Sequence, residues 1–546
     1  MTTISFYTLG CRSNQYETDR MARSASTCGY EVVPYPGPAD IYVINTCTVT
    51  SAAEKKSRHI IRHAKKINKD SKIIVTGCAV ERDGLGMEEM DLIIKNKDKF
   101  DLMKFLEKKI ISTSTPQLAS AFSSRKQLTD PIIANASTNN RIDLAKHLDG
   151  TRSKIENENS SASSHLFTSS PLLVRSNLMV EDGCENFCSY CIVPYVRGKI
   201  SSRPMDEIVS EAKQMVKDGV KEIVLTGINL GEFKNTDDQI SNADQIVNNG
   251  AKENRSPEIG LDGFKVSNNQ IPSAEQIQTS EFKTSLPQLA GTSSDIILSS
   301  EEIEASRNGQ DPLQALISDL PSLIDAISNI DGLLRIRLSS IEPNYINDDL
   351  IKAVKENPKV CKHFHIPLQS GDNGILKAMN RNYTANDFLN IANRIKKQIK
   401  DAAITTDIIV GFPGESEQAF KNTLKLAGKI GFSRIHIFPY SDRPGTKAQK
   451  LRNKIDHKII DTRFKRLDKL REKLMLKFHR SFKDQAMEVL IEQRDRKTGA
   501  LEGLTSNYIR VFLCGDDTGD ESIGSIISVK FRDFQGENVI ARPILV

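Results

Sequence analysis

The sequence predicts a multidomain α/β protein that ends in a small β-barrel, and three observations lead to this prediction. The chain is 546 residues long, which is more than one ordinary core accommodates. Short apolar runs alternate with amphipathic helical patterns as far as about residue 440. The last stretch carries only short apolar runs, which Gly and Asp turns divide. Repeated strand and helix units with right-handed crossovers build a parallel sheet or barrel.

The first predicted domain covers residues 2–112. Its buried strands are expected at 4–8, 41–45 and 73–76, with helical patterns between them, which indicates a small α/β domain. The periodicity then fades, and 19 of the 60 residues in 111–170 are Ser or Thr. We therefore predict a polar linker at 113–169.

The second predicted domain covers residues 170–478. It alternates expected helices, such as 205–217 and 385–397, with expected strands at 222–225, 334–338, 364–367, 405–410 and 435–438. A disordered insertion is predicted at 234–311, because this segment carries 13 Asp and Glu against 6 Lys and Arg and is rich in Asn, Gln and Ser.

The C-terminal part combines a basic helix with a β-domain. Residues 447–483 are helical in pattern and hold 14 Lys and Arg against 4 Asp and Glu. The domain at 479–546 has apolar runs at 487–491, 509–513, 526–531 and 538–540, which indicate a small barrel or sandwich. The formal net charge of +5 therefore conceals an acidic insertion and a basic arm.

Membrane insertion and secretion are not expected. No stretch of about 18 uncharged apolar residues occurs, and the N-terminus lacks the features of a signal peptide. Nine cysteines in 546 residues are too few for a disulfide scaffold, and six of them form two groups of three. We expect a cytoplasmic protein in a reducing compartment.

The first group of cysteines is Cys184, Cys188 and Cys191, in the run GCENFCSYC. Three thiolates within eight residues can hold one metal centre from a single loop. A structural zinc site normally closes with four ligands, and no fourth Cys or His lies nearby. Three ligands would leave one iron of a cubane iron-sulfur cluster open for a substrate or cofactor.

The second group is Cys11, Cys47 and Cys78, which lie far apart in the sequence. Each follows the end of an expected strand, in FYTLGC, IYVINTC and IIVTGC. The ends of parallel strands share one edge of a sheet, so the three side chains should converge. Three separately buried apolar cysteines are the alternative. We favour a second cluster with one open iron.

Dense motifs carry a family resemblance. The spacing of Cys184, Cys188 and Cys191 resembles that of the radical S-adenosylmethionine (radical SAM) superfamily, and the order of the domains resembles the methylthiotransferase family. The final domain, through EGLTSNYIRV at 502–511, resembles the TRAM domain, an RNA-binding barrel. The family motifs are TLGCRSNQYETDRM (8–21), NTCTVT (45–50), GCENFCSYCIVPYVRG (183–198), LTGIN (225–229), RLSSIEP (337–343), HIPLQSG (365–371), GFPGE (411–415) and FPYSDRPGTKA (438–448).

The resemblance implies a fold and an activity. It implies a partial TIM-like radical SAM barrel, and its closest branch is the MtaB-type, which converts N6-threonylcarbamoyladenosine beside the tRNA anticodon into its 2-methylthio derivative. Methylthiolation of isopentenyladenosine in tRNA or of a ribosomal protein are the near alternatives. A non-enzymatic iron-sulfur RNA-binding protein is the alternative from another class. Ser13 and the two insertions depart from the family pattern.

The resemblance also implies cofactors, partners and site residues. Two 4Fe-4S clusters are expected, one on Cys184, Cys188 and Cys191 and an auxiliary one on Cys11, Cys47 and Cys78, with all six cysteines catalytic. The tRNA anticodon loop, a reductant such as flavodoxin or ferredoxin, and a sulfur donor are the expected partners, and the basic arm is expected to hold tRNA phosphates. Candidate contacts to S-adenosylmethionine are Thr226, Gly227, Asn229, Ser340, Glu342, Gln369 and Gly411.

Overall fold

The computed structural model describes residues 1–81, 85–86, 88–107, 174–235, 320–495, 498–513 and 522–544. These residues belong to one unit, which consists of Met1–Asn235 and Asp319–Val546. The predicted linker at 113–169 and all but the first two residues of the predicted insertion at 234–311 lie outside the described residues. Within the described ranges, no helix has the length and apolar character needed to cross a membrane.

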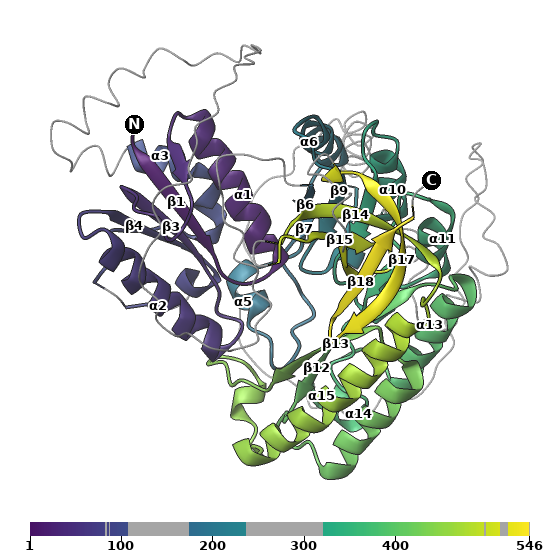
Figure 1. Ribbon diagram of the computed structural model, residues 1–546. Helices are drawn as coiled ribbons and strands as arrows, with labels where there is room; N and C mark the ends of the chain where they lie inside the picture. Colours follow the sequence, from purple (N-terminus) through teal and green to yellow (C-terminus); the bar gives the residue numbers. More distant parts are fainter. Residues whose placement is uncertain are drawn as a thin grey trace, which may run out of the picture. The chain divides into compact units, whose positions relative to one another are not determined.

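The N-terminal part is a five-stranded parallel sheet with helices on both faces (Figure 1). Met21, Ala22 and Ala25 of helix α1 pack against one face, and Ile60, Ile61 and Ala64 of α2 pack against the other. All six residues of the central strand β3 are buried, as expected for a parallel strand that is covered on both sides. The expected strands at 4–8, 41–45 and 73–76 are confirmed. The sheet order is β2 (Glu31–Val33), β1 (Thr3–Thr8), β3 (Ile41–Thr46), β4 (Lys72–Gly77) and β5 (Leu92–Ile93), and the helices are α1 (Arg12–Thr27), α2 (Ser51–Ile67), η1 (Cys78–Glu81), η2 (Asn96–Asp101) and α3 (Leu102–Phe105).

The central part contains two three-stranded parallel sheets. Their orders are β10-β9-β6 and β11-β12-β13. Isolated parallel bridges, Ile336 to Val360 and Ser340 to His365, join β10 to the segment around β11, so the six strands follow one another in a partial barrel. The strands are β6 (Arg175–Met179), β9 (Glu222–Thr226), β10 (Arg335–Leu338), β11 (His363–His365), β12 (Ala403–Val410) and β13 (Arg434–Pro439).

Helices follow most of these strands and cover the outside of the barrel. The main helices are α6 (Met205–Lys217), α10 (Leu320–Ser328), α11 (Asp348–Glu356), α13 (Ala385–Gln398) and α14 (Glu417–Ile430). The expected helices and strands of this part are confirmed, except that β11 ends at His365 instead of residue 367. The short elements are β7 (Glu181–Asp182), α5 (Val193–Arg197), β8 (Ser201–Ser202), η5 (Leu230–Glu232), η6 (Pro343–Tyr345), α12 (Asn373–Ala378) and η7 (Ala448–Lys450).

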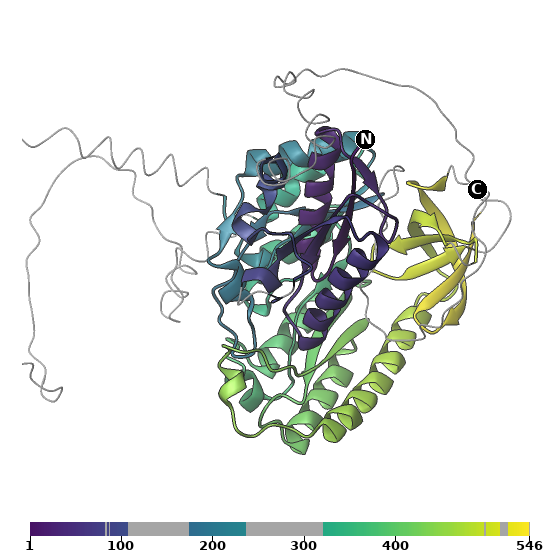
Figure 2. The ribbon, with the colours of Figure 1, turned by 90° about the vertical axis from the view of Figure 1, so that its left-hand side faces the viewer.

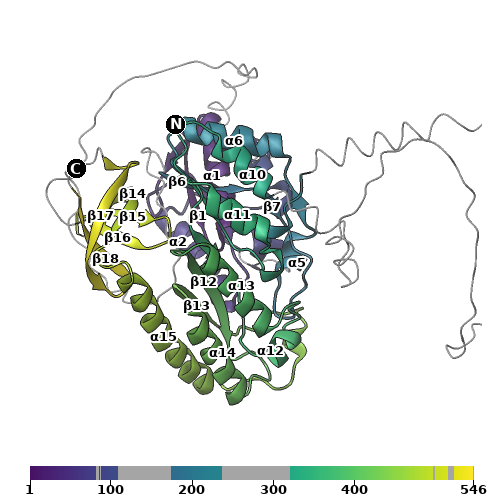
Figure 3. The same ribbon diagram turned by 90° about the vertical axis from the view of Figure 1, so that its right-hand side faces the viewer.

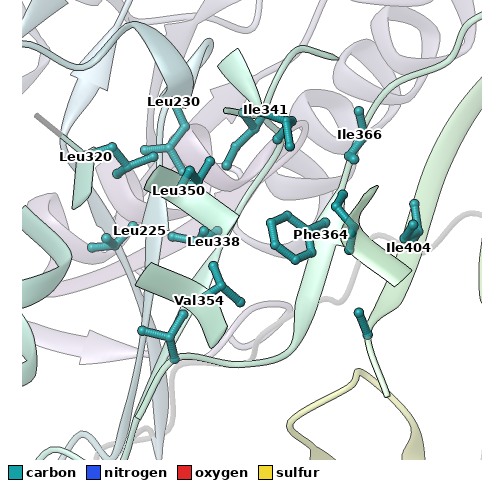
Figure 4. Packing of buried hydrophobic residues seen from close by; sticks show 14 of the residues in the cluster. Leu225, Leu230, Leu320, Leu338, Ile341, Leu350, Val354, Phe364, Ile366 and Ile404 are labelled. Carbon is teal, nitrogen blue, oxygen red and sulfur yellow. The ribbon is translucent and has the colours of Figure 1, made fainter. Parts of the chain in front are cut away.

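A continuous apolar core fills the space between strands and helices. Leu225, Leu338 and Phe364 project from successive strands and meet Leu350 and Val354 of α11 (Figure 4). Each of these side chains is at most 2% exposed. Burying one side chain of this size stabilises the fold by about 1.5–3 kcal/mol, so the core holds the strand ends in fixed positions.

The C-terminal part is a closed five-stranded barrel, drawn in yellow in Figure 2. Val489, Val511, Val529 and Phe531 fill its interior. The strand β15 was not among the expected ones, whereas the other four match them. The barrel order is β14 (Ala486–Arg494), β15 (Leu501–Thr505), β16 (Arg510–Leu513), β18 (Asn538–Pro543) and β17 (Ile526–Gln535).

This barrel docks on the central strands through buried arginines. Arg335 donates to the carbonyl oxygen of Leu504 at 2.6 Å, and Arg337 donates to those of Thr505 and Ser506 at 3.1 Å each. The ring of Tyr508 stacks on His363, with 4.3 Å between ring centres and 5° between planes. The C-terminal barrel therefore packs directly against the central strands.

The basic stretch at 447–483 is not one helix. It contains the short turn η7 and the long helix α15 (His457–Arg480), which leads into the barrel (Figure 3). Arg463 is 5% exposed and pairs with Glu415 at 2.8 Å. The expectation that the whole basic arm faces tRNA is therefore wrong for Arg463, because this side chain holds α15 against the core.

His479, near the end of α15, predicts a pH-dependent stability. It is 5% exposed, and burial lowers its pKa to about 4. In the unfolded chain this histidine takes up a proton below about pH 6.5. Its contribution to the free energy of unfolding is therefore fully present above that pH and is lost as the pH falls toward 4. The loss from this residue should reach up to about 3 kcal/mol. Urea denaturation of wild type and His479→Gln from pH 7 to 4 tests this, and equal pH slopes for both proteins would contradict it.

Candidate functional site

Cys11, Cys47 and Cys78 lie at the carboxyl edge of the N-terminal sheet, just beyond β1, β3 and β4. Two glycines allow the loops that carry these cysteines to lie close together. A Cβ on Gly10 would lie 3.2 Å from the Sγ of Cys47, and a Cβ on Gly77 would lie 2.4 Å from the backbone oxygen of Thr46. Both have positive φ, which glycine adopts without strain. The expected convergence of the three cysteines is therefore present.

Asn14 holds the loops that carry these cysteines. Its amide nitrogen donates to the carbonyl oxygens of Leu9 at 2.8 Å and Thr46 at 3.0 Å. Its amide oxygen accepts from the Sγ of Cys11 at 3.3 Å. Asn14 belongs to the motif at 8–21, and this membership is the only signal in the sequence for its role.

Cys184, Cys188 and Cys191 lie in the loop between β7 and α5. The loop is tied to the end of α12: the hydroxyl of Ser189 donates to the carbonyl of Ala378 at 2.7 Å, and the Ser189 N–H donates to that of Met379 at 2.9 Å. Arg381 donates to the Sγ of Cys188 at 3.2 Å and pairs with Glu342.

The spacing of the sulfur atoms argues against zinc. Sulfur ligands of one tetrahedral zinc ion lie about 3.8 Å apart, since each Zn–S bond is about 2.3 Å long. In the part of the chain that the structure describes, the one group of three potential ligand atoms within 4.8 Å of one another is His365, Asp407 and His436, and neither cysteine group meets this limit. In a cubane each thiolate binds a different iron, which separates the sulfurs further. The spacing of both cysteine groups is therefore compatible with a cubane cluster.

Arg197 connects the two cysteine groups. It lies at the end of α5, and it donates to Asn14 at 2.7 Å, to Glu17 at 2.9 Å and to Asp182 at 2.7 Å. Burial favours neutral Glu17, but Arg197 and Lys99 outweigh this effect and lower its pKa, so the carboxylate is ionised. Arg197 lies in the motif at 183–198, but its contacts with Asn14 and Glu17 have no signal in the sequence.

Burial keeps most of the thiols neutral in the protein without metal. It raises the pKa of Cys78 to about 11 and those of Cys47, Cys184 and Cys191 to about 12. Metal ions bind the thiolate, so loading the sites releases protons. A bound cation would supply the stabilisation that these thiolates otherwise lack.

The seven candidate contacts to S-adenosylmethionine follow successive parallel strands. Thr226, Gly227 and Asn229 lie at the end of β9, Ser340 and Glu342 after β10, Gln369 after β11 and Gly411 after β12. Carboxyl ends of parallel barrel strands meet at one face, where barrel enzymes bind ligands. Glu342 also reaches the cysteine loop through Arg381, as described above.

Asn229 and Gly411 differ in what surrounds them. Asn229 is 1% exposed, and neither polar atom of its side chain forms a hydrogen bond of good geometry within the described residues, although Tyr345 lies close to it. A buried amide without partners is costly, so this group is available to a ligand. At Gly411, a Cβ would lie 2.4 Å from Ile460 of α15, so the space beside this glycine is filled by the protein itself.

Replacing Gly77 by Ala should destabilise the N-terminal part and displace Cys78. The positive φ of 95° and the backbone atoms 2.4 Å from the new Cβ should together cost about 2–4 kcal/mol. Urea denaturation and iron content after reconstitution provide the measurement. Gly428→Ala is the matched control: no atom outside its own helix lies within 4 Å of the added Cβ, and it should be neutral or stabilising. Equal stability of the two variants would contradict the prediction.

Comparisons with known proteins cover nearly the whole chain. Residues 3–98 match the family model described as uncharacterized protein family UPF0004, and residues 179–249 and 291–427 match the radical SAM superfamily. The threonylcarbamoyladenosine tRNA methylthiotransferase MtaB of Thermotoga maritima is 30% identical, over 99% of this chain and 97% of its own length. The protein of that name from Bacillus subtilis is 29% identical, over 97% and 94%. The tRNA-2-methylthio-N(6)-dimethylallyladenosine synthase of Lachnoclostridium phytofermentans is also 29% identical, over 98% and 94%.

Proposed function

The chain belongs to the MtaB-type radical SAM methylthiotransferases, and from this premise we propose that it converts N6-threonylcarbamoyladenosine in tRNA into 2-methylthio-N6-threonylcarbamoyladenosine. The observation that carries the proposal is the presence of two cysteine groups at strand ends of two α/β parts, joined by Arg197. Carbon 2 of adenine is not acidic, so ordinary base catalysis cannot place sulfur there, and cofactors must supply the chemistry.

The six cysteines hold two 4Fe-4S clusters. When bound, the cluster at Cys184, Cys188 and Cys191 would supply the electron that cleaves S-adenosylmethionine, and the open iron of the cluster at Cys11, Cys47 and Cys78 would hold the sulfur that is transferred to carbon 2. The chain orients these ligands: Asn14 fixes the Cys11 loop, and Ser189 fixes the loop of Cys188. Asn229 is a contact for S-adenosylmethionine, because its buried amide forms no hydrogen bond of good geometry in the described structure. Thr226, Gly227, Ser340, Glu342 and Gln369 remain proposed contacts, whereas Ile460 fills the space beside Gly411.

Charged side chains around the loop complete the site. Arg381 stands between Cys188 and Glu342, and Arg197 stands between the loop and Glu17. Both guanidiniums are largely buried and would offset the negative charge that thiolate-bound clusters bring. A reductant such as flavodoxin or ferredoxin, a sulfur donor and a cytoplasmic location belong to the same proposal.

The exposed lysines of α15 form a surface for tRNA phosphates. Lys465, Lys469 and Lys473 recur every four residues on the exposed side of the helix, and no described carboxylate pairs with them. The barrel that follows, which resembles an RNA-binding domain in sequence, would extend this surface. A target base in a single-stranded anticodon loop can enter the site without the melting of a duplex.

Replacing Lys465, Lys469 and Lys473 together by Gln should weaken tRNA binding and raise its KM. Each lost phosphate contact removes about 0.7–0.9 from the magnitude of the slope of log K against log salt, so the loss of three contacts should reduce it by about 2–3. Binding of tRNA at several salt concentrations gives the measurement. The Lys→Arg triple variant keeps the charges and should retain the wild-type slope. An unchanged slope in the Gln variant would show that these lysines face solvent and do not bind tRNA phosphates.

The substrate is tested in cells that lack their own threonylcarbamoyladenosine methylthiotransferase. Expression of this chain should restore 2-methylthio-N6-threonylcarbamoyladenosine in tRNA hydrolysates, as measured by mass spectrometry. Because a dimethylallyladenosine synthase is nearly as similar, the strain should also lack that enzyme. Appearance of only the methylthiolated dimethylallyl nucleoside would reassign the chain to the other branch. Methylthiolation of neither nucleoside would refute the proposal.

A further inference from the structure

Arg12 directly follows Cys11 and is the first residue of α1. Its Nη2 donates to the hydroxyl oxygen of Tyr508 at 3.3 Å. Its Nη1 is buried and has no hydrogen-bond partner, and Arg12 forms no ion pair with a carboxylate in the described ranges. A guanidinium has five N–H donors, and leaving a buried one largely unpaired is costly. Among the described residues, Arg12 therefore has no carboxylate within ion-pair distance, although Glu222 acts on it through longer-range charge.

The neighbouring arginines are already paired. Arg12 and three other guanidiniums surround Tyr508 and lower its pKa, although burial alone would raise it. The other three each have a carboxylate partner. These pairs are Arg175 with Glu492 at 2.8 Å, Arg337 with Glu222 at 2.6 Å and Arg434 with Glu537 at 2.7 Å.

The barrel strands beside Tyr508 offer no free carboxylate to Arg12. His363 stacks on Tyr508 and shares the hydroxyl of Thr405 with His365, at 2.9 Å each. Asp407, the carboxylate next along the same face of β12, lies 3.3 Å from the Nε2 of His365. Arg12 is also among the charges that lower the pKa of Asp407, so the two groups interact at longer range, but no described carboxylate lies within ion-pair distance of Arg12.

The proposed substrate carries an anion in a suitable place. In adenine, carbon 2 and carbon 6 are both bonded to N1, so a group on N6 hangs beside the carbon that receives sulfur. The threonylcarbamoyl group on N6 ends in a carboxylate, whereas a dimethylallyl group is uncharged. Arginine binds a carboxylate with two parallel hydrogen bonds. Cys11, one residue from Arg12, belongs to the group that we assign to the cluster supplying that sulfur.

We propose that Arg12 binds the carboxylate of the threonylcarbamoyl group and thereby selects this nucleoside. The inference rests on the proposed function and adds a specificity-determining residue to it. Tyr508, which already contacts Arg12, holds the guanidinium in place. A dimethylallyl substrate would leave Arg12 unpaired, and a site built for a polar group rejects an analogue that lacks it.

The test compares two RNA hairpins that differ only at the carboxylate. One anticodon stem-loop carries threonylcarbamoyladenosine, and the other carries its neutral threonine amide, so both present the same phosphates. Fluorescence anisotropy with the iron-loaded protein, without S-adenosylmethionine, gives the ratio of the two Kd values. We expect wild type to bind the acid about 10- to 100-fold more tightly than the amide, and Arg12→Gln to bind both equally. Arg12→Lys should keep part of the preference.

The ratio of the Kd values for the acid and amide hairpins distinguishes a loss of carboxylate recognition from a folding defect. A partly unfolded variant changes both Kd values alike and leaves their ratio intact. Arg23→Gln, on the same helix but 43% exposed, should behave as wild type. A wild-type ratio near one, or a wild-type ratio in Arg12→Gln, would overturn the role of Arg12. Failure of the wild-type protein to methylthiolate the acid hairpin with S-adenosylmethionine and reductant would instead refute the proposed function.

Discussion

Replacing Cys184, Cys188 and Cys191 together by Ala should abolish formation of 5′-deoxyadenosine. The three thiols lie in one loop, which contacts of Ser189 and Arg381 anchor to the barrel. The loop contains no other cysteine. Anaerobic reconstitution should give about eight iron atoms in wild type and about four in the variant. Iron analysis and chromatography of the reaction products provide the measurement.

The control for this experiment is Cys28→Ala. Cys28 lies at the end of α1, outside both cysteine groups, and is exposed. This variant should keep both the iron content and 5′-deoxyadenosine formation. If the triple variant also kept all its iron, the loop would not be a cluster site.

Replacing Cys11, Cys47 and Cys78 together by Ala should separate the two halves of the reaction. Cys184, Cys188 and Cys191 lie in another part of the chain, so the variant should keep about four iron atoms and should still form 5′-deoxyadenosine. No methylthiolated nucleoside should form, because the variant lacks the ligands of the proposed auxiliary cluster. Mass spectrometry of tRNA nucleosides and of the small-molecule products measures both activities in one reaction.

The contacts of Arg197 make a second control necessary for the variant that lacks Cys11, Cys47 and Cys78. It contacts Asn14 and Glu17 behind the Cys11 loop, so a collapse of that loop could disturb the loop of Cys188. The single variant Cys11→Ser changes the exposed member of the group and leaves the buried ones in place. It should show the same separation of activities. Methylthiolation at the wild-type rate in the triple variant would refute the role of the N-terminal cysteines.

The sequence predicted the positions of the cysteines because local patterns determine them. Strand ends can be located from apolar runs, and the ends of parallel strands share an edge, so Cys11, Cys47 and Cys78 could be brought together without coordinates. The side chains that support them could not. Arg197 and Glu17 are 180 residues apart, and Arg381 and Cys188 are 193 apart. Only the packing of separate elements creates these contacts.

Two further differences have local physical causes. Arg463 belongs to a basic run that looks solvated, but Glu415, 48 residues earlier, lies in the turn beneath α15 and neutralises it. Strand β15 contains Glu502 and Gly503, which interrupt its apolar pattern. Gly503 is required there, because a Cβ would lie 2.5 Å from the carbonyl oxygen of Leu490 on the neighbouring strand. A residue selected for close strand packing thus removed the signal that would have revealed the strand.

The docking of the C-terminal barrel limits which parts can be exchanged between related enzymes. Tyr508 contacts Arg12 of the first part and His363 of the second, while Arg335 and Arg337 donate to barrel carbonyls. A hybrid gene that exchanges only the barrel would bring a foreign neighbour to Arg12 and to the ends of two central strands. The barrel should therefore be inherited together with α1, and natural or engineered changes of substrate should involve both ends of the gene.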